Sequence, residues 1–279
     1  MKHRLLGTVA WTALLASAAM AADMRLKAPP PPAIYSWTGF YIGLNAGGAW
    51  GRSDAETSVS CAAPAPFLPY FCNAVAGQAN AAAVAAAGTG SMSGSGFTGG
   101  GQVGYNFQNG NVVFGGELDI EAFNLRLSRR TSANYPFDFL PGMSTRTFTI
   151  NSSLDTGWLF TARGRIGWAF DTVLVFATGG LAVTNLRASH TFSDNFAPPG
   201  LGAWNGSATK TGWTAGGGVE WAMGRTWSVK VEYLYLNFGS VGATGTIVNP
   251  SGILGYANGI STSVDLTAHI ARAGINFRF

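Results

Sequence analysis

The sequence carries little charge and, beyond its N-terminal segment, has no apolar run long enough to cross a membrane as a helix. Only 11% of its 279 residues are charged, against about 25% in ordinary soluble domains. A transmembrane helix requires about 20 consecutive apolar residues. Yet 47% of the residues are hydrophobic, so the apolar residues must be dispersed through another pattern.

Residues that carry catalysis or bind metals are also scarce. The chain has three histidines and two cysteines, and neither a metal-ligand spacing nor a Ser/His/Asp arrangement is visible. Residues Gly99–Gly104 match the GxGxxG dinucleotide fingerprint, but no helix opens after them and no βαβ unit surrounds them, so we reject that interpretation. We therefore expect no cofactor, no metal and no enzymatic activity.

Glycine and aromatic residues are abundant instead, with 39 Gly, 18 Phe, 9 Trp and 8 Tyr. Lipid offers no partners for free backbone N–H and C=O groups, so only helices and closed β-barrels can span a bilayer. Dispersed apolarity without a helical span therefore predicts a barrel.

Residues 1–21 have the pattern of a secretory signal peptide. A basic start is followed by an apolar stretch up to Ala19 and by an A-x-A site, which predicts cleavage between Ala21 and Ala22. A retained helical anchor is the weaker alternative, because the stretch is short for a span and small residues crowd its end. Cleavage removes two of the 17 basic residues and leaves 15 against 13 acidic ones, a balance that argues against a nucleic-acid partner.

The remainder divides into a lead-in and a barrel domain. Residues 22–36 are rich in proline and are expected to form an extended periplasmic lead-in. Residues 37–279 contain apolar and aromatic stretches with the period-two alternation of β-strands. The predicted strands are 36–51, 96–108, 111–127, 154–170, 172–188, 211–223, 226–240 and 263–279.

The connections between these strands are alternately very short and long. Short turns are predicted at 108–111, at Asp171 and at 224–225, and Asn-Gly in the first is a strong hairpin signal. Four long loops lie on the other side, the first reaching Ser95 and the last covering 241–262. Short periplasmic turns and long extracellular loops are typical of outer-membrane barrels. We therefore predict an all-β, eight-stranded antiparallel transmembrane up-and-down barrel.

The charge on the two strand faces separates this prediction from a soluble up-and-down barrel such as a lipocalin. In 111–127, Glu117 and Asp119 alternate with Leu118 and Ile120. A soluble barrel turns its apolar face inward, and a membrane barrel does the reverse. Aromatic residues near the strand ends, as expected at a membrane interface, favour the membrane barrel. These are Trp168, Phe170, Trp221, Trp227, Phe277 and Phe279.

Nine charged residues on the predicted lumen face have complementary signs on neighbouring strands. An eight-stranded barrel is only just wide enough for its own side chains, so we expect an ion-pair network that leaves little room for a continuous pore. Unpaired charges hydrated by lumen water are the alternative. We expect changes in the network to destabilise the protein more than a change at Asp194, in a predicted loop. The network comprises Glu117, Asp119, Glu121, Arg163, Arg165, Glu220, Lys230, Glu232 and Arg272.

Cys61 and Cys72 both fall in the first predicted long loop. In an oxidising periplasm and at the cell surface, we expect them to form a disulfide that closes a proline-rich loop, and free thiols are the alternative. The Ala-rich run 74–87 is either a short helix or flexible.

The two histidines of the predicted mature chain fall in different places. His190 lies in a predicted loop, and His269 lies in the last predicted strand. Strict alternation puts His269 on the lipid face with Phe279, although a place near the outer interface or a parity-shifting bulge would also account for it. Barrel-embedded lipid-modifying enzymes place a catalytic histidine at such a rim, so catalysis is kept as a minor alternative.

Four blocks of the sequence resemble a known family. They are SWTGFYIGLNAGGAWG near the predicted mature start, ATGGLAV at 177–183, VKVEYLYLNFG at 229–239 and RAGINFRF at the C-terminus. They are similar to the small porin-like outer-membrane immunogenic proteins of alphaproteobacteria, within the OmpA-like and opacity-type barrel superfamily. The resemblance implies an integral protein of the bacterial outer membrane that contacts lipid and lipopolysaccharide and is exposed as a surface antigen.

The resemblance also gives a role to the C-terminus. Outer-membrane strands end in a polar-x-Gly-x-x-aromatic-x-aromatic pattern that resembles the signal read by the barrel assembly machinery, and Arg272, Gly274, Phe277 and Phe279 match it position by position. We expect a structural barrel that supports envelope integrity. A narrow porin for small solutes, or loops that bind a host factor or haem, are the alternatives.

Overall fold

A computed structural model describes residues 35–72, 78–137, 146–251 and 253–279. Residues 35–279 belong to one compact unit. The predicted signal peptide, its cleavage site at Ala21 and Ala22, and the lead-in up to residue 34 lie outside the described residues.

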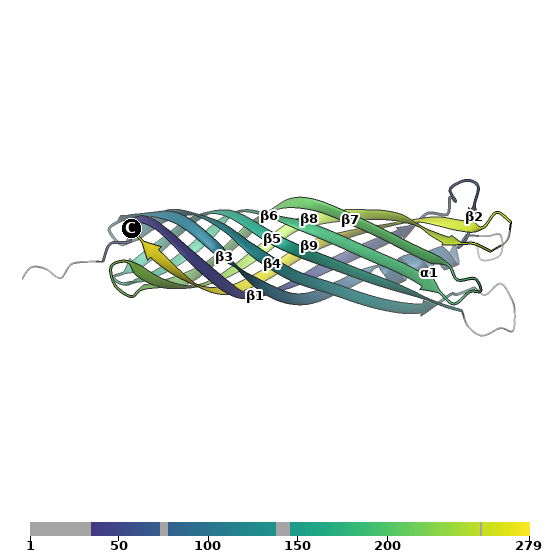
Figure 1. Ribbon diagram of the computed structural model, residues 1–279, viewed down its shortest axis with the longest axis horizontal. Helices are drawn as coiled ribbons and strands as arrows, with labels where there is room; N and C mark the ends of the chain where they lie inside the picture. The colour runs from purple at the N-terminus through teal and green to yellow at the C-terminus, as the bar shows by residue number, and fades with distance from the viewer. Residues whose placement is uncertain (1–34, 73–77, 138–145, 252) are drawn as a thin grey trace, which may run out of the picture. The chain divides into compact units, whose positions relative to one another are not determined.

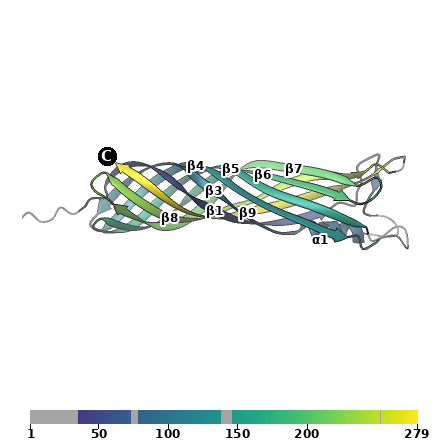
Figure 2. The same ribbon diagram turned by 60° about the horizontal axis from the view of Figure 1, so that its bottom comes forward.

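The described residues form a ring of eight long antiparallel strands, which confirms the predicted fold class (Figures 1 and 2). Each strand pairs with the next one along the chain, and β9 pairs back with β1 to close the ring. The eight strands are β1 (Gly39–Val59), β3 (Gly90–Asn109), β4 (Val112–Asn134), β5 (Thr147–Phe170), β6 (Val173–Asp194), β7 (Leu201–Ala222), β8 (Trp227–Asn249) and β9 (Tyr256–Arg278).

Short turns join β3 to β4, β5 to β6 and β7 to β8, as predicted. Gly110 in the first turn and Asp171 in the second have φ angles of 61° and 56°. Glycine adopts this left-handed region without steric cost, and Asp tolerates it better than most residues. Trp37 is fully buried and its Nε1 donates to the Asp171 carbonyl at 3.0 Å, so the segment before β1 is held against the turn between β5 and β6.

The connections at the opposite end are shorter than predicted, because the strands continue beyond their predicted boundaries. The interval 241–262, expected as a loop, belongs largely to β8 and β9, and residues 250–255 separate the two strands. Likewise β7 begins at Leu201 instead of near residue 211. These segments are rich in Ser, Thr, Gly and Asn, and their aromatic residues are few, with Trp204 buried. They therefore do not show the repeated outward aromatic pattern that marks the membrane part of the strands.

The two strand faces exchange character part of the way along the barrel. On β4, the exposed side chains change from Leu118 and Ile120 to Asn124 and Arg126, while the buried ones change from carboxylates to Phe123. An outer face that meets lipid must be apolar, whereas one that meets water must be polar. Near the short turns, the strands therefore have the apolar outer face of a membrane barrel. Farther along, they have the polar outer face and apolar interior of a soluble barrel.

Two small elements lie between β1 and β3 in the sequence. They are α1 (Ala79–Gly88) and the two-residue strand β2 (Leu68–Pro69), which pairs in parallel with β9. The described part of the Ala-rich run is thus helical. Both elements lie at the end of the barrel opposite the C-terminus (Figure 1). Among the described residues, no helix is long and apolar enough to cross a membrane.

Candidate functional site

The nine charged residues expected in the lumen all lie inside the ring, each with at most 5% of its surface exposed. Arg163 on β5 is one centre of this charged layer. Its Nη1 donates to Glu232 Oε1 at 2.7 Å and its Nη2 to Asp119 Oδ2 at 2.9 Å, and it also contacts Glu117. Glu117 and Arg163 are register partners, so strand pairing alone brings them together.

Arg272 on β9 is the second centre of the charged layer. Its Nη2 lies 2.8 Å from Asp119 Oδ1 and 2.7 Å from Glu232 Oε2, and its Nη1 lies 3.2 Å from Glu121 Oε2. Asp119 and Glu232 therefore accept from both Arg163 and Arg272. The contacts form one cluster across the lumen, rather than separate pairs along the ladder.

The charged layer continues toward the short turns. Lys230 Nζ lies 2.9 Å from Glu117 Oε1, and Arg165 Nη2 lies 2.9 Å from Glu220 Oε2. Glu220 and Lys230 are register partners on β7 and β8. Lys230 nevertheless reaches across the lumen to Glu117, because the narrow ring brings the opposite wall within reach.

Two further residues belong to this layer and were not predicted. Tyr41 Oη donates to Glu117 Oε2 at 2.7 Å and accepts from Arg165 at 3.1 Å. Arg278 Nη2 lies 3.9 Å from Glu220 Oε1, and with it the layer has equal numbers of cations and carboxylates. Arg278 shares the strand parity of Arg272, which is the signal that could have identified it. Tyr41 carries no charge that would distinguish it in the alternation.

Beyond the charged layer, away from the short turns, an apolar layer fills the interior. It is formed by inward side chains from around the ring, each almost wholly buried, and Phe123 continues the inward row of Glu121 on β4. This apolar layer was not predicted, because the content of the lumen was inferred from the charged residues alone. Its largest members include Phe123, Leu125, Leu127, Leu154, Leu159 and Phe238.

The disulfide loop lies at the end of the barrel opposite the short turns. Cys61 and Cys72 form a disulfide with a Cα–Cα distance of 5.5 Å. The neighbouring Phe71 is buried, and its ring lies 5.7 Å from that of Phe192 and 6.1 Å from that of Tyr135. The loop thus packs into the mouth of the barrel.

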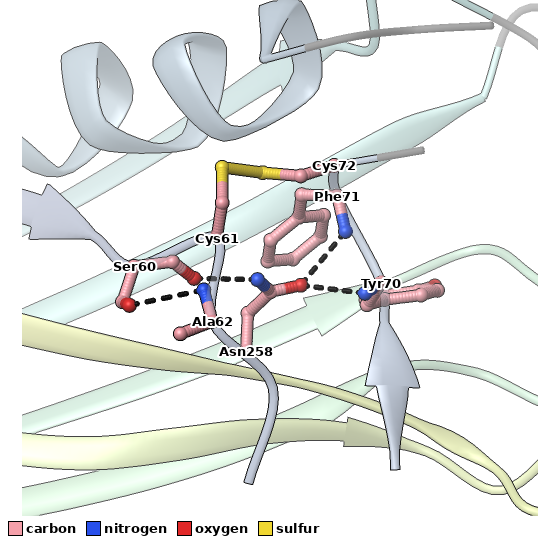
Figure 3. Close-up of a disulfide and its surroundings, with 7 residues drawn as sticks. All are labelled: Ser60, Cys61, Ala62, Tyr70, Phe71, Cys72 and Asn258. Carbon is pink, nitrogen blue, oxygen red and sulfur yellow. Dashed lines mark hydrogen bonds between the residues drawn. A yellow bond between two sulfur atoms is a disulfide. The ribbon is translucent and has the colours of Figure 1, made fainter. Parts of the chain in front are cut away.

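Asn258 of β9 holds the two arms of this loop together (Figure 3). Its Oδ1 accepts from the backbone N–H groups of Tyr70 and Phe71 at 2.7 and 2.8 Å, and its Nδ2 donates to the Ser60 carbonyl at 2.5 Å. A single wall residue therefore binds the chain on both sides of the disulfide.

Asp194, at the end of β6, joins the loop to the opposite wall. It accepts from Tyr70 Oη at 2.6 Å and Tyr135 Oη at 2.9 Å, and from the Gly200 N–H at 2.7 Å. Burial, together with the nearby Asp194 carboxylate, raises the pKa of both tyrosines above the usual value. The expectation of a loop residue with few contacts was wrong, because β6 extends to Asp194.

The helix α1 completes this cap on the barrel mouth. Val84 is fully buried, and the Asn80 side chain accepts from the Phe137 N–H at 3.1 Å. Arg129 Nη1 donates to the Ala87 carbonyl at 3.0 Å. The described part of the first long loop thus places several apolar side chains, including Phe71 and Val84, within the barrel mouth, which the sequence did not indicate.

His190 lies in β6 and not in a loop as predicted. Its ring is buried, its Nδ1 is 2.9 Å from Ser152 Oγ, and it stacks on Trp204 at 5.4 Å. Burial lowers the pKa of His190 from 6.5 to about 4.

His269 lies on the outer face, as strict alternation predicts, and β9 keeps its alternation through this position. Its ring stacks on Trp50 with centroids 6.0 Å apart, and its Nδ1 is 2.5 Å from Tyr233 Oη. These contacts place His269 within an aromatic border. Among the described residues, no group of three or more His, Cys, Asp or Glu is arranged to hold a metal.

Exposed apolar side chains surround the barrel between two aromatic borders. Phe40 and Trp50 on β1 lie at the two edges of this band. On a strand that rises about 3.3 Å per residue and is tilted about 40°, the interval between them spans about 25 Å. The border near the short turns includes Phe40, Trp168, Phe170, Trp221, Trp227 and Phe279, and the other, not predicted, includes Trp50, Trp158, Trp213 and Tyr233.

The C-terminal residues lie where the ring closes. The Phe279 N–H donates to the Phe40 carbonyl at 3.0 Å. The Phe277 ring lies 5.1 Å from that of Trp227 and 5.3 Å from that of Phe279. At Gly274 a Cβ would lie 3.0 Å from the Leu44 carbonyl oxygen, so close approach of β1 favours glycine there.

A closed ring with a charged interior, an apolar outer band and two aromatic borders defines an integral β-barrel of the bacterial outer membrane. The sequence matches the family described as outer membrane protein beta-barrel domain over residues 9–279, and the chain belongs to this family.

Several known proteins are similar to this chain over most of its length. The 31 kDa outer-membrane immunogenic protein of Brucella melitensis is 30% identical, and the match covers 100% of both chains. The 25 kDa outer-membrane immunogenic protein of Brucella abortus is 23% identical over 80% of this chain and 78% of its own. The crystal structure of OprG from Pseudomonas aeruginosa is 11% identical, with a TM-score of 0.39 over 87% of this chain and 97% of its own.

Proposed function

We propose that this protein is a structural barrel with a closed lumen, which supports the integrity of the outer membrane and acts as a surface antigen without catalytic activity. The observation that carries the proposal is the succession of filled layers along the barrel. The charged layer centred on Arg163 and Arg272 is followed by the apolar layer and then by the disulfide-linked cap. An ion crossing the apolar layer would lose its hydration without gaining polar partners, which is strongly unfavourable.

The antigenic part of the proposal rests on relatives whose names describe immunogenic outer-membrane proteins. Polar residues on the outer faces of the extended strands, such as Asn124 and Arg126, supply an exposed surface beyond the membrane band. We further propose contact with lipopolysaccharide around this surface, and recognition by the assembly machinery through Arg272, Gly274, Phe277 and Phe279.

Single-channel conductance tests the closed lumen. Purified full-length mature protein in a planar bilayer should give no persistent discrete openings, whereas a general porin reconstituted in parallel should give them. Persistent openings that scale with the amount of folded protein would contradict the closed lumen and support the narrow porin.

A deletion strain tests the structural role. Loss of the protein should increase sensitivity to detergents and to large antibiotics, and plasmid-borne wild-type protein should restore resistance. Unchanged sensitivity in the deletion strain would contradict a role in envelope integrity while leaving the closed lumen to be judged by conductance.

A further inference from the structure

A polar groove crosses the outside of the barrel over β4, β5 and β6. It lies beside Trp158, which belongs to the aromatic border farther from the short turns. The volume of the groove is about 800 Å³. Arg126 on β4, Asp155 on β5 and Arg187 on β6 form a row across it, because Asp155 is the register partner of Arg126 on one side and of Arg187 on the other.

The floor of the groove is built by irregular strand pairing. The register shifts between β4 and β5 and again between β5 and β6. Asn185 Oδ1 accepts from the N–H groups of Gly157 and Trp158 at 3.0 and 3.2 Å. Thr156 Oγ1 donates to the Phe123 carbonyl at 2.5 Å. Side chains therefore satisfy backbone groups that the shifted ladder leaves free, and they fix the shape of the groove.

The charges in the groove suit an anion. Arg126 Nε lies 2.6 Å from Asp155 Oδ1 while its side chain remains 80% exposed, so Asp155 orients the guanidinium and leaves its other N–H groups toward solvent. Arg187 is also exposed. Two guanidinium groups and one carboxylate give the row a net positive charge, and guanidinium forks match the geometry of phosphate oxygens.

The height of the groove indicates where the anion comes from. Asp155 precedes Trp158 on β5, so it lies farther from the short turns than Trp158 does. On a tilted strand, three residues place it about 7 Å beyond the aromatic border that contains Trp158. Aromatic borders mark the headgroup level of the membrane, and phosphorylated sugars occupy this level in the outer leaflet. Building on the lipopolysaccharide contact proposed above, on which this inference rests, we propose that Arg126 and Arg187 bind a phosphate group of lipopolysaccharide in this groove, with Trp158 at the boundary between the sugar and the acyl chains.

Titration of the folded full-length mature protein in zwitterionic detergent with fluorescent lipopolysaccharide tests the proposal. The double variant Arg126→Gln/Arg187→Gln should bind at least tenfold more weakly than wild type. Arg130→Gln removes an exposed cation farther along β4 and should bind as wild type does. Asp155→Asn keeps both cations and should bind at least as tightly. Heat-modifiable migration on gels shows that each variant is folded.

Competition identifies the ligand. Unlabelled lipopolysaccharide should displace the probe, while its chemically dephosphorylated form, phosphatidylglycerol and millimolar inorganic phosphate should displace it at least tenfold less effectively. Equal affinity of the double variant and Arg130→Gln would overturn the site. Equal competition by the dephosphorylated form would overturn phosphate recognition, and effective displacement by inorganic phosphate or phosphatidylglycerol would overturn the assignment to lipopolysaccharide.

Discussion

Arg163 Nη1 lies 2.7 Å from Glu232 Oε1, although 69 residues separate them in the sequence and their strands are not neighbours in the ring. The contact crosses the lumen. Each of these residues also binds a charge on a third strand, since Arg163 contacts Asp119 and Glu232 contacts Arg272. The charged layer therefore connects opposite walls of the barrel and resists changes in its cross-section.

Removing one partner from this layer should destabilise the protein strongly. Arg163→Ala and Glu232→Ala are each expected to lower the free energy of unfolding by about 3–5 kcal/mol, because a buried charge is left without its partner. The double variant should cost less than the sum of the two. Denaturant titration of protein folded in detergent provides the measurement.

The control for this comparison is Glu56→Ala, because Glu56 is exposed on β1, whereas Asp194 binds two tyrosines. Glu56→Ala should change the free energy of unfolding by no more than about 0.5 kcal/mol. Effects of equal size at Glu56 and Arg163 would argue against the buried network as a source of stability.

The mouth of the barrel should depend on its disulfide. Cys61→Ser/Cys72→Ser is expected to reduce the stability of the extracellular half by about 2–3 kcal/mol, as the chain-entropy model gives for a loop of this length. Hydrogen exchange at Tyr70 and Phe71 should accelerate, while exchange near Arg163 should change little. Uniform acceleration throughout the barrel would show that the cap and the charged layer unfold together.

Residues that are placed by strand alternation and strand order could be predicted from the sequence. Residues that are placed by the change in the barrel interior or by an inward-folding loop could not. Glu117 and Arg163 were predicted to face the lumen from neighbouring strands, because alternation and strand order determine their faces. Phe123 has the same parity as Glu121, so alternation alone does not reveal that the interior becomes apolar beyond the membrane. The contact of Asp194 with Tyr70 joins residues 124 positions apart through a loop that folds inward, and no local pattern encodes that path.

His190 should make the stability of the extracellular half depend on pH. Its pKa is about 4 in the folded protein and about 6.5 when unfolded, so the unfolded chain binds more protons between these values. Stability should therefore fall as the pH decreases from about 6.5 to about 4. Unfolding midpoints at pH 7, 5.5 and 4 should show a smaller decrease for His190→Gln than for wild type, and identical profiles would exclude His190 as the cause.

Phe279 should matter more for assembly than for stability. Its side chain is 75% exposed on the outer face, and its backbone contributes one hydrogen bond to Phe40, so deletion should reduce the free energy of unfolding by only about 1 kcal/mol. If Phe279 completes the assembly signal, its deletion should lower the amount of protein in the outer membrane several-fold. Phe170→Ala, which removes another exposed aromatic side chain from the same border, should leave that amount near the wild-type level. Fractionation and immunoblotting of the outer membrane measure both variants, and normal levels of the truncated protein would show that assembly does not require Phe279.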